Sequence, residues 1–381
     1  MTTPIDAVLH ADTRSTAWPR DAFLAAGVAL CTHLDTTLAS SHQATTDSSI
    51  LWIRPYTLAD IPPLMRLPGT LRLDVPDSLV ARRAELLDVP AALPILRRDR
   101  PTFVATADGH PVGFVRFSPR GPDGRWVAVA IAASAGVYSP EPVWEALLAH
   151  GVRAAGLRGV RRLFARVPVG HPLVEVMRRA GWVSYSRETV FRAERMTAVE
   201  RPVRGLRLQE PADTWAIHQL YASAVPRQIQ EIEAFTSHAW HMDPRRRTRR
   251  GTRQTGWLLI EGDKLVAYAR YTRGPRAGMI DAVVPPGERA HLGAILDGVI
   301  AAPTRPRPVY CALRAYLLDL RDELTERGFV EIGEQELLIR YTTATARTPA
   351  VDPVHFPVEL RQALPSRVPT FLEGQPTDGT V

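Results

Sequence analysis

Asparagine is absent from the 381-residue sequence, and Lys264 is its single lysine, so arginine supplies nearly all of the basic charge. Lysine and arginine together number 47 against 40 acidic residues, which gives a formal net charge of +7. Such a balance allows an acidic or nucleic-acid partner without establishing one. The missing asparagine reflects a GC-rich genome, selection against thermolabile amides in a hot habitat, or both.

Long apolar runs and paired cysteines are missing as well. No apolar stretch approaches the ~20 residues that a membrane-spanning helix needs, so we expect no membrane partner. The apolar patch from Phe23 to Leu30 has neither a basic start nor a small-residue cleavage site, so we expect no signal peptide. Cys31 and Cys311 lie far apart and form no metal or redox motif. These features predict a cytoplasmic protein with reduced thiols.

The sequence does contain one succession of predicted strands and helices that occurs in both of its halves. The first half begins with "ILWIRPYTLADIPPLMRL", a strand and a helix, and continues with a hairpin turning at Asp108-Gly109. A strand and helix around Ser139 follow, then "RRLFARVP", "HPLVEVMRRAGW" and the alternating "VSYSRETVFRAE". In the second half, "RPVYCAL…LTERGFVEIGEQELLIR" corresponds to "RRLFARV…MRRAGWVSYSRETVFR" at nearly equal spacing. We interpret this as the internal repeat of a whole domain.

The predicted organisation has four parts. Residues 1–49 form a Thr/Ser/Ala-rich extension with at most one helix, and residues 348–381 form a Pro-rich tail. Residues 50–197 and 203–343 are the two repeats. The predicted fold class is α/β, with two tandem domains that each hold a mixed, mostly antiparallel sheet flanked by helices. We expect both repeats to have the same strand order.

The order strand, helix, long hairpin, strand, helix, strand, helix, strand resembles the GCN5-related N-acetyltransferase (GNAT) superfamily. "IRPYTLADIPPLMRL" is similar to its first strand and helix, "DGHPVGFVRF" to its second and third strands, and "RRAGW" and "TERGF" to its Gly-Phe segment. The resemblance implies a tandem member. It also implies acetyl-CoA or another acyl-CoA as cofactor, held by a Q/R-x-x-G-x-G/A loop whose N–H groups point at the pyrophosphate.

In the first copy this loop departs from the family pattern. It reads Ser139-Pro140-Glu141-Pro142-Val143-Trp144. Pro142 has no N–H to offer, Trp144 takes the place of a glycine, and Glu141 adds a negative charge. We expect a closed phosphate position, with the ring of Trp144 or Pro142 over the start of the helix. The alternative is an ordinary helix start, with Ser139 as cap and a proline in the first turn.

The second copy departs less. Its loop, "VVPPGERAHLGAIL", keeps a small residue at Gly293, and Arg289 is suited to meet a phosphate. The alternative is a helix capped by Gly287 in which Glu288 favours the dipole. If either copy binds a CoA, we expect it to be this one. Its candidate cofactor-binding residues are Val283, Val284, Arg289 and Gly293.

At the positions where the resemblance implies acid–base residues, this sequence has other residue types. The resemblance places a general acid where this chain has Met177 and Leu324, which have no proton to donate. Tyr185 and Tyr316 lie out of register, and we expect them to pack in the core. Candidates for a general base are His110, Glu188, Asp281 and Glu336. His238 and His241 are three residues apart without further ligands, so we expect no metal.

The most charged run is "DPRRRTRRGTRQ", between a helix and a strand of the second repeat. It is either a solvated loop or a grip for an acidic or nucleic-acid partner. The candidate partner-binding residues are Arg245, Arg246, Arg247, Arg249 and Arg250.

Two functions follow as hypotheses. In the first, the missing groups mark a GNAT-fold protein that has lost acetyl transfer and serves as a ligand-binding or protein-interaction module. In the second, the protein is an acyl-CoA-dependent N-acyltransferase whose second copy binds the cofactor. The other partner is then an unknown small-molecule amine or a protein.

Overall fold

A computed structural model of the chain describes residues 51–80, 101–120, 124–134, 139–197, 204–242, 252–301 and 308–342. The chain divides into two compact units, Met1–Ala344 and Thr345–Val381, and the second lies outside the described ranges. The predicted N-terminal extension, the Pro-rich tail and the arginine run at 245–250 also lie outside them. No described helix is long and apolar enough to cross a membrane.

Within its described residues, the first repeat has seven strands with helices between them. Its elements are β1 (Trp52–Pro55), η1 (Leu58–Asp60), α2 (Ile61–Met65), β2 (Leu71–Arg72), α3 (Asp77–Val80), β3 (Thr102–Ala107), β4 (His110–Arg120), β5 (Arg125–Ala133), α5 (Pro140–Gly156), β6 (Arg162–Pro168), α6 (Leu173–Arg179) and β7 (Val183–Ala193). The β3–β4 hairpin turns at Asp108 and Gly109, both with positive φ, as predicted from this pair.

The second repeat follows the same order. Its elements are β8 (Leu206–Leu208), η2 (Pro211–Asp213), α7 (Thr214–Ala224), α8 (Arg227–Glu233), η3 (Ser237–Trp240), β9 (Arg253–Glu261), β10 (Lys264–Arg273), β11 (Gly278–Val283), α9 (Arg289–Ala301), β12 (Val309–Arg314), η4 (Ala315–Leu320), α10 (Arg321–Thr325) and β13 (Val330–Tyr341). The sequence "RQIQEIEAFTSHAW" (227–240) predicts one continuous helix, and this prediction is wrong in its second half. Ala234 adopts a left-handed conformation, which ends α8, and a separate turn of 3-10 helix follows.

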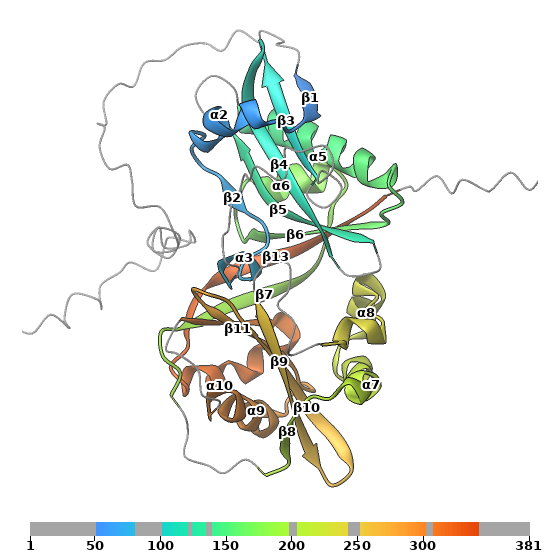
Figure 1. Cartoon of the computed structure of the whole chain (residues 1–381), viewed down its shortest axis with the longest axis vertical. Helices are drawn as coiled ribbons and strands as arrows, with labels where there is room; N and C mark the ends of the chain where they lie inside the picture. The colour runs from blue at the N-terminus through green and yellow to red at the C-terminus, as the bar shows by residue number, and fades with distance from the viewer. Residues whose placement is uncertain are drawn as a thin grey trace, which may run out of the picture. The chain divides into compact units, whose positions relative to one another are not determined.

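The strands form one sheet in the order β1-β3-β4-β5-β6-β13-β7-β12-β11-β10-β9-β8, with β2 beside β5. Read inward from either end, both halves show three antiparallel pairs, then one parallel pair (β5–β6 or β11–β12), then an antiparallel strand. The prediction of equal strand order is confirmed. The innermost strands are exchanged: β13 of the second repeat pairs with β6, and β7 of the first pairs with β12 (Figure 1).

The same capping device opens both repeats. Arg54 donates to both oxygens of Asp60 at 2.5 and 2.7 Å, and Arg207 does the same to Asp213 at 2.6 and 2.7 Å. Each aspartate also accepts a backbone N–H three residues earlier, from Thr57 or Glu210, at 2.7 Å. This pairing, six residues apart in both copies, supports the duplication independently of the strand order.

We expect Asp213→Asn to lower the free energy of unfolding by about 1 kcal/mol at pH 7, since it weakens a charged cap. The hydrogen bond from Arg207 holds the pKa of Asp213 below its usual range. A depressed pKa contributes stability above the unfolded-state pKa and loses it as the pH falls. The difference between wild type and variant should therefore shrink below about pH 4. Urea denaturation at pH 7 and pH 3 measures it, with Asp263→Asn, on an exposed turn, as the control. A pH-independent difference would contradict the charge argument.

Helices cover both faces of the sheet. In the second repeat α9 and α10 pack on one face over Ile280, Cys311 and Leu313, while α7 and α8 lie on the other face (Figure 1). In the first repeat, α5 and α6 cover the main core, and the small helix α2 covers the other face. The predicted layering, helices on both sides of a mixed sheet, is confirmed.

Candidate functional site

Each repeat contains a parallel strand pair that separates after a few residues. β5 and β6 pair only at Trp126–Leu163 and Val127–Phe164. β11 and β12 pair only at Gly278–Val309, Met279–Tyr310 and Ile280–Cys311. Beyond these pairs the two strands of each repeat diverge and leave a gap in the sheet. The first gap lies between β5 and β6, and the second lies between β11 and β12. Along the chain, α5 follows β5 and α9 follows β11. The loops predicted to hold a cofactor stand at the carboxyl ends of β5 and β11, so the two gaps are the candidate sites.

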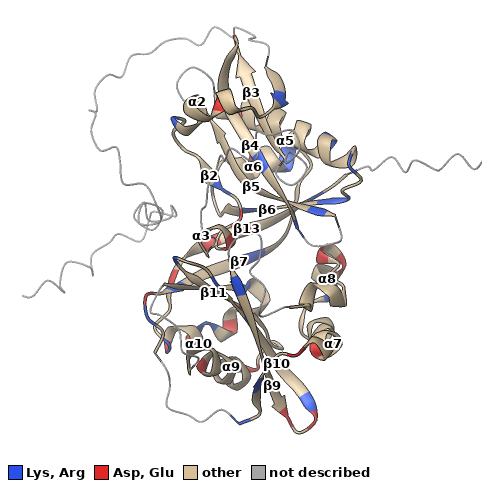
Figure 2. Cartoon of the chain, in the orientation of Figure 1, with Lys and Arg blue, Asp and Glu red and all other residues tan. Residues whose placement is uncertain are grey.

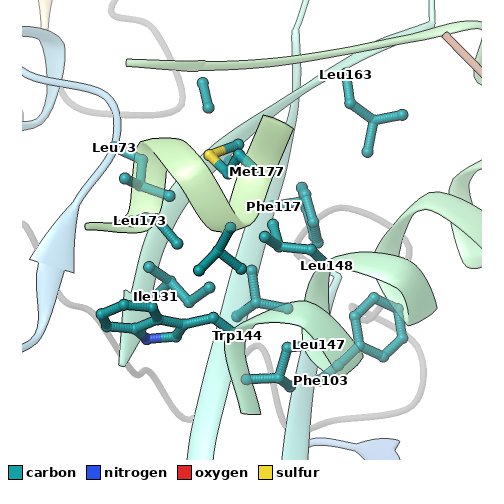
Figure 3. Packing of buried hydrophobic residues seen from close by; sticks show 14 of the residues in the cluster. Leu73, Phe103, Phe117, Ile131, Trp144, Leu147, Leu148, Leu163, Leu173 and Met177 are labelled. Carbon is teal, nitrogen blue, oxygen red and sulfur yellow. The ribbon is translucent and has the colours of Figure 1, made fainter. Parts of the chain in front are cut away.

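In the first repeat the chain itself fills the gap. Leu71 and Arg72 pair with Ile131 and Ala130 of β5. The N–H of Leu73 donates to Val129 O at 2.8 Å, and Leu73 O accepts the N–H of Arg166 on β6 at 2.9 Å. The Leu73 side chain is fully buried in the core beneath α5 and α6, close to Met177 (Figure 3). The segment Leu71–Asp74, which is β2 and the two residues after it, therefore lies between β5 and β6.

The start of α5 has few groups that could bind an anion. Pro140 and Pro142 stand in its first turn and have no N–H. The N–H of Glu141 bonds its own carboxylate, which also accepts the Ser139 hydroxyl, and these bonds hold the pKa of Glu141 below its usual value. The described part of this loop agrees with the predicted closed position.

Trp144 does not lie where we expected it. Instead of covering the helix start, its ring is 8% exposed in the core and lies 5.9 Å from the ring of His171, near Ile131 (Figure 3). It stands one turn inside α5, on the same side as Val143, Leu147 and Leu148, and this apolar stripe directs it toward the sheet. The helix start is blocked by the prolines and Glu141 rather than by the indole.

In the second repeat, the chain's own carboxylates surround the start of α9. The Gly287 N–H donates to Asp319 Oδ2 at 3.1 Å. Arg289 lies 3.3 Å from Asp322 and 3.5 Å from Glu323, both on α10. A Cβ on Gly293 would come within 2.5 Å of Glu323 Oε2, so this glycine is needed for the close approach of α10. Acidic side chains thus take the partners that a pyrophosphate would use.

The four predicted cofactor-binding residues of this copy lie in different surroundings. Val284 is buried in the core under α9, and Val283 packs toward α7 on the other face. Arg289 and Gly293 both face α10. Arg289 and Gly293 are thus occupied by contacts within the chain. The residues present do not fit the pyrophosphate of an acyl-CoA.

Of the four candidate bases, two are held in buried ion pairs. Glu188 accepts from Gln335 Nε2 at 2.6 Å and lies 3.0 Å from Arg166 and 3.2 Å from Arg314. Glu336 lies 2.9 Å from Arg178. His110 stands exposed at the start of β4. In Figure 2 acidic and basic ribbon segments meet around α3, β7 and β13, which is where the ion pairs of Glu188 lie.

Asp281 differs from the other three. It stands on β11 at the edge of the second gap, with 36% of its side chain exposed, opposite Arg270 at 3.4 Å. Burial raises the pKa of its carboxyl, and Arg270 offsets only part of that effect. It is the one candidate base that stands at a gap and keeps accessible surface.

The other positions considered for acid–base chemistry are occupied by side chains that pack in the core. Met177 and Leu324 are fully buried, so neither position supplies an acid. Tyr185 and Tyr316 pack in the cluster under α7, as expected, and burial raises the pKa of each to about 12. Within the described ranges, no three histidine, cysteine, aspartate or glutamate side chains are grouped as a metal site.

No protein-family model matches the sequence, and no curated protein does either. Among solved structures, a tandem GNAT protein from the clavulanic acid biosynthesis pathway aligns with 77% of this chain and 98% of its own, at 18% identity and a TM-score of 0.44. A GCN5-related N-acetyltransferase from Sphaerobacter thermophilus aligns over 76% and 95%, at 13% identity and 0.45. A putative acetyltransferase from Pyrococcus horikoshii aligns over 80% and 94%, at 12% and 0.40.

The names of these three proteins call them GNAT proteins or acetyltransferases, and one of them is a tandem protein. The strand order and the diverging parallel pair of each repeat agree with the order expected from the sequence resemblance. At these identities and TM-scores the likeness to solved structures carries no argument about this chain's chemistry. The chemistry has to be argued from the residues at the two gaps.

Proposed function

We propose that this protein is a binding module built on a duplicated acetyltransferase fold, and that neither copy transfers acetyl groups. One observation carries the proposal: groups of the chain itself take both positions at which the fold would receive an acyl-CoA. Leu71–Asp74 lies in the first gap, and Asp319 and Glu323 surround the start of α9 beside the second.

Electrostatics supports the same proposal. A helix N-terminus contributes only about 0.3–1 kcal/mol toward a negative charge. At α9 this contribution already stabilises protein carboxylates, and Arg289 is engaged by two of them. A pyrophosphate entering here would have to displace Asp319 and approach Glu323. Repulsion between these like charges weakens binding further.

The second candidate function is acyl-CoA-dependent N-acyltransfer at the second copy, with acetyl-CoA or another acyl-CoA as donor and a small-molecule amine as acceptor. Asp281 favours it, because a partly exposed carboxyl with a raised pKa is suited to accept a proton. Its weakness is the crowding of carboxylates at the start of α9.

Acetyl-CoA at millimolar concentration is expected to leave the melting temperature of the full chain unchanged. A ligand at 100 times its Kd would stabilise the fold by about 2.7 kcal/mol, which is a shift of several degrees. Differential scanning fluorimetry measures this. The control pair is Arg289→Glu, at the start of α9, and Arg227→Glu, on the exposed surface of α8. A shift that Arg289→Glu abolishes and Arg227→Glu keeps would show that the second copy binds acetyl-CoA, which contradicts the observation that carries the first proposal and favours the second candidate.

A further inference from the structure

The second gap leaves backbone groups without a strand partner. Asp281–Val283 of β11 have β10 on one side, and Ala312–Arg314 of β12 have β7 on the other. Across the gap between them, no backbone hydrogen bond from the described residues bridges the two segments. Successive residues of a strand alternate in the side to which their N–H and C=O point. Some of these groups therefore face the gap, and Asp281, Ala282, Val283 and Ala312 all keep accessible surface.

The first gap shows what such an opening can hold. There Leu73 bonds β5 through its N–H and β6 through its C=O. The segment runs antiparallel to β5 and alternates in character: Leu71 and Leu73 face the α5 core, whereas the Asp74 carboxylate lies 3.4 Å from Arg120. The occupant is an extended strand with apolar residues on one side and charged residues on the other.

The second gap offers the same two kinds of surroundings. On the α9 side lie the apolar side chains of Ala282 and Leu313. On the opposite side lie Asp281, with Arg270 beside it, and Arg314, and between them the apolar side chains of Val283 and Ala312. A strand inserted here would meet an apolar surface with one set of alternate residues, and with the other set a surface that carries Asp281, Arg270 and Arg314 among apolar side chains.

We propose that the gap between β11 and β12 binds an extended peptide strand of alternating apolar and charged residues, in the way that the gap between β5 and β6 holds Leu71–Asp74. This rests on the proposed function, because an acyl-CoA would compete for the same opening. It names the partner as a polypeptide segment recognised mainly through its backbone.

The test uses the full chain and a labelled, end-capped peptide of this protein's own sequence, TLRLDVP (residues 70–76). Its matched control carries N-methyl groups on both leucines, which keep the side chains and remove alternate N–H donors. Fluorescence anisotropy should show saturable binding of the first peptide and binding at least about tenfold weaker for the second. Hydrogen exchange should slow at 281–284 and 312–314 when the first peptide is bound.

Three results would overturn the inference: no binding at millimolar peptide, equal binding of both peptides, or slowed exchange at the outer strands β1 or β8 in place of the gap. The same exchange measurement with acetyl-CoA separates this inference from the proposed function. Slowed exchange at 287–293 with acetyl-CoA would refute the binding-module proposal whatever the peptide does. Failure of the peptide alone would leave that proposal standing.

Discussion

Leu73→Ala is expected to lower the free energy of unfolding by about 2–5 kcal/mol, the range for truncating a fully buried leucine. The side chain is 0% exposed, and its backbone joins two strands that otherwise diverge. Urea denaturation measures the loss, with an unchanged slope as the sign that the fold persists. Leu157→Ala is the matched control, since Leu157 is 84% exposed, and it should change stability by less than about 0.5 kcal/mol.

The same variant separates two explanations for the filled gap. If Leu71–Asp74 were a loosely held cover, the cost of Leu73→Ala would stay below about 1 kcal/mol, and the opened gap would bind acetyl-CoA. We expect neither result. The stability cost is larger because Leu73 is fully buried. Acetyl-CoA stays unbound because Pro140, Pro142 and Glu141 block the start of α5 even when the gap is vacated. A thermal shift of Leu73→Ala with acetyl-CoA would show that the segment is a displaceable cover.

Helices and turns could be predicted from the sequence where single residues determine their start or end. Asp108-Gly109 fixes a hairpin, Pro140 starts a helix, and Gly181 and Gly328 end helical turns with positive φ. The repeat was visible for the same reason, since both copies carry these signals at matching positions. The capping pairs Arg54–Asp60 and Arg207–Asp213 were also visible as an arginine and an aspartate six residues apart, and that signal was missed.

Pairing partners were not predictable in this way. β7 and β13 both begin with alternating apolar and polar residues and continue into a buried run, and nothing in either pattern tells whether a strand returns to its own repeat or crosses to the other. The strand at Leu71–Asp74 is short and lies next to Pro76, so its alternation is a weak signal. Asp319 is one acidic residue among many, and only the fold brings it to the Gly287 N–H.

The exchanged strands place a buried carboxylate where the two repeats meet. Glu188 on β7 stands opposite Gln335 on β13, and these are equivalent strands of the two copies. It also lies 3.0 Å from Arg166 of the first repeat and 3.2 Å from Arg314 of the second. Removing it leaves charged groups from both repeats without their shared counter-ion.

Glu188→Ala is therefore expected to cost about 3 kcal/mol, the lower end of the range for breaking a buried ion pair, because Arg166 keeps Asp77 and Arg314 keeps Glu233 as partners. The control is Glu175→Ala on α6, whose carboxylate lies 2.6 Å from Arg178 but is 64% exposed, so its loss should stay below about 1 kcal/mol. Combining Glu188→Ala with Arg314→Ala should cost less than the sum of the two single losses, because the double variant removes both partners. Equality of the double loss and that sum would mean that Glu188 and Arg314 stabilise the fold independently of each other.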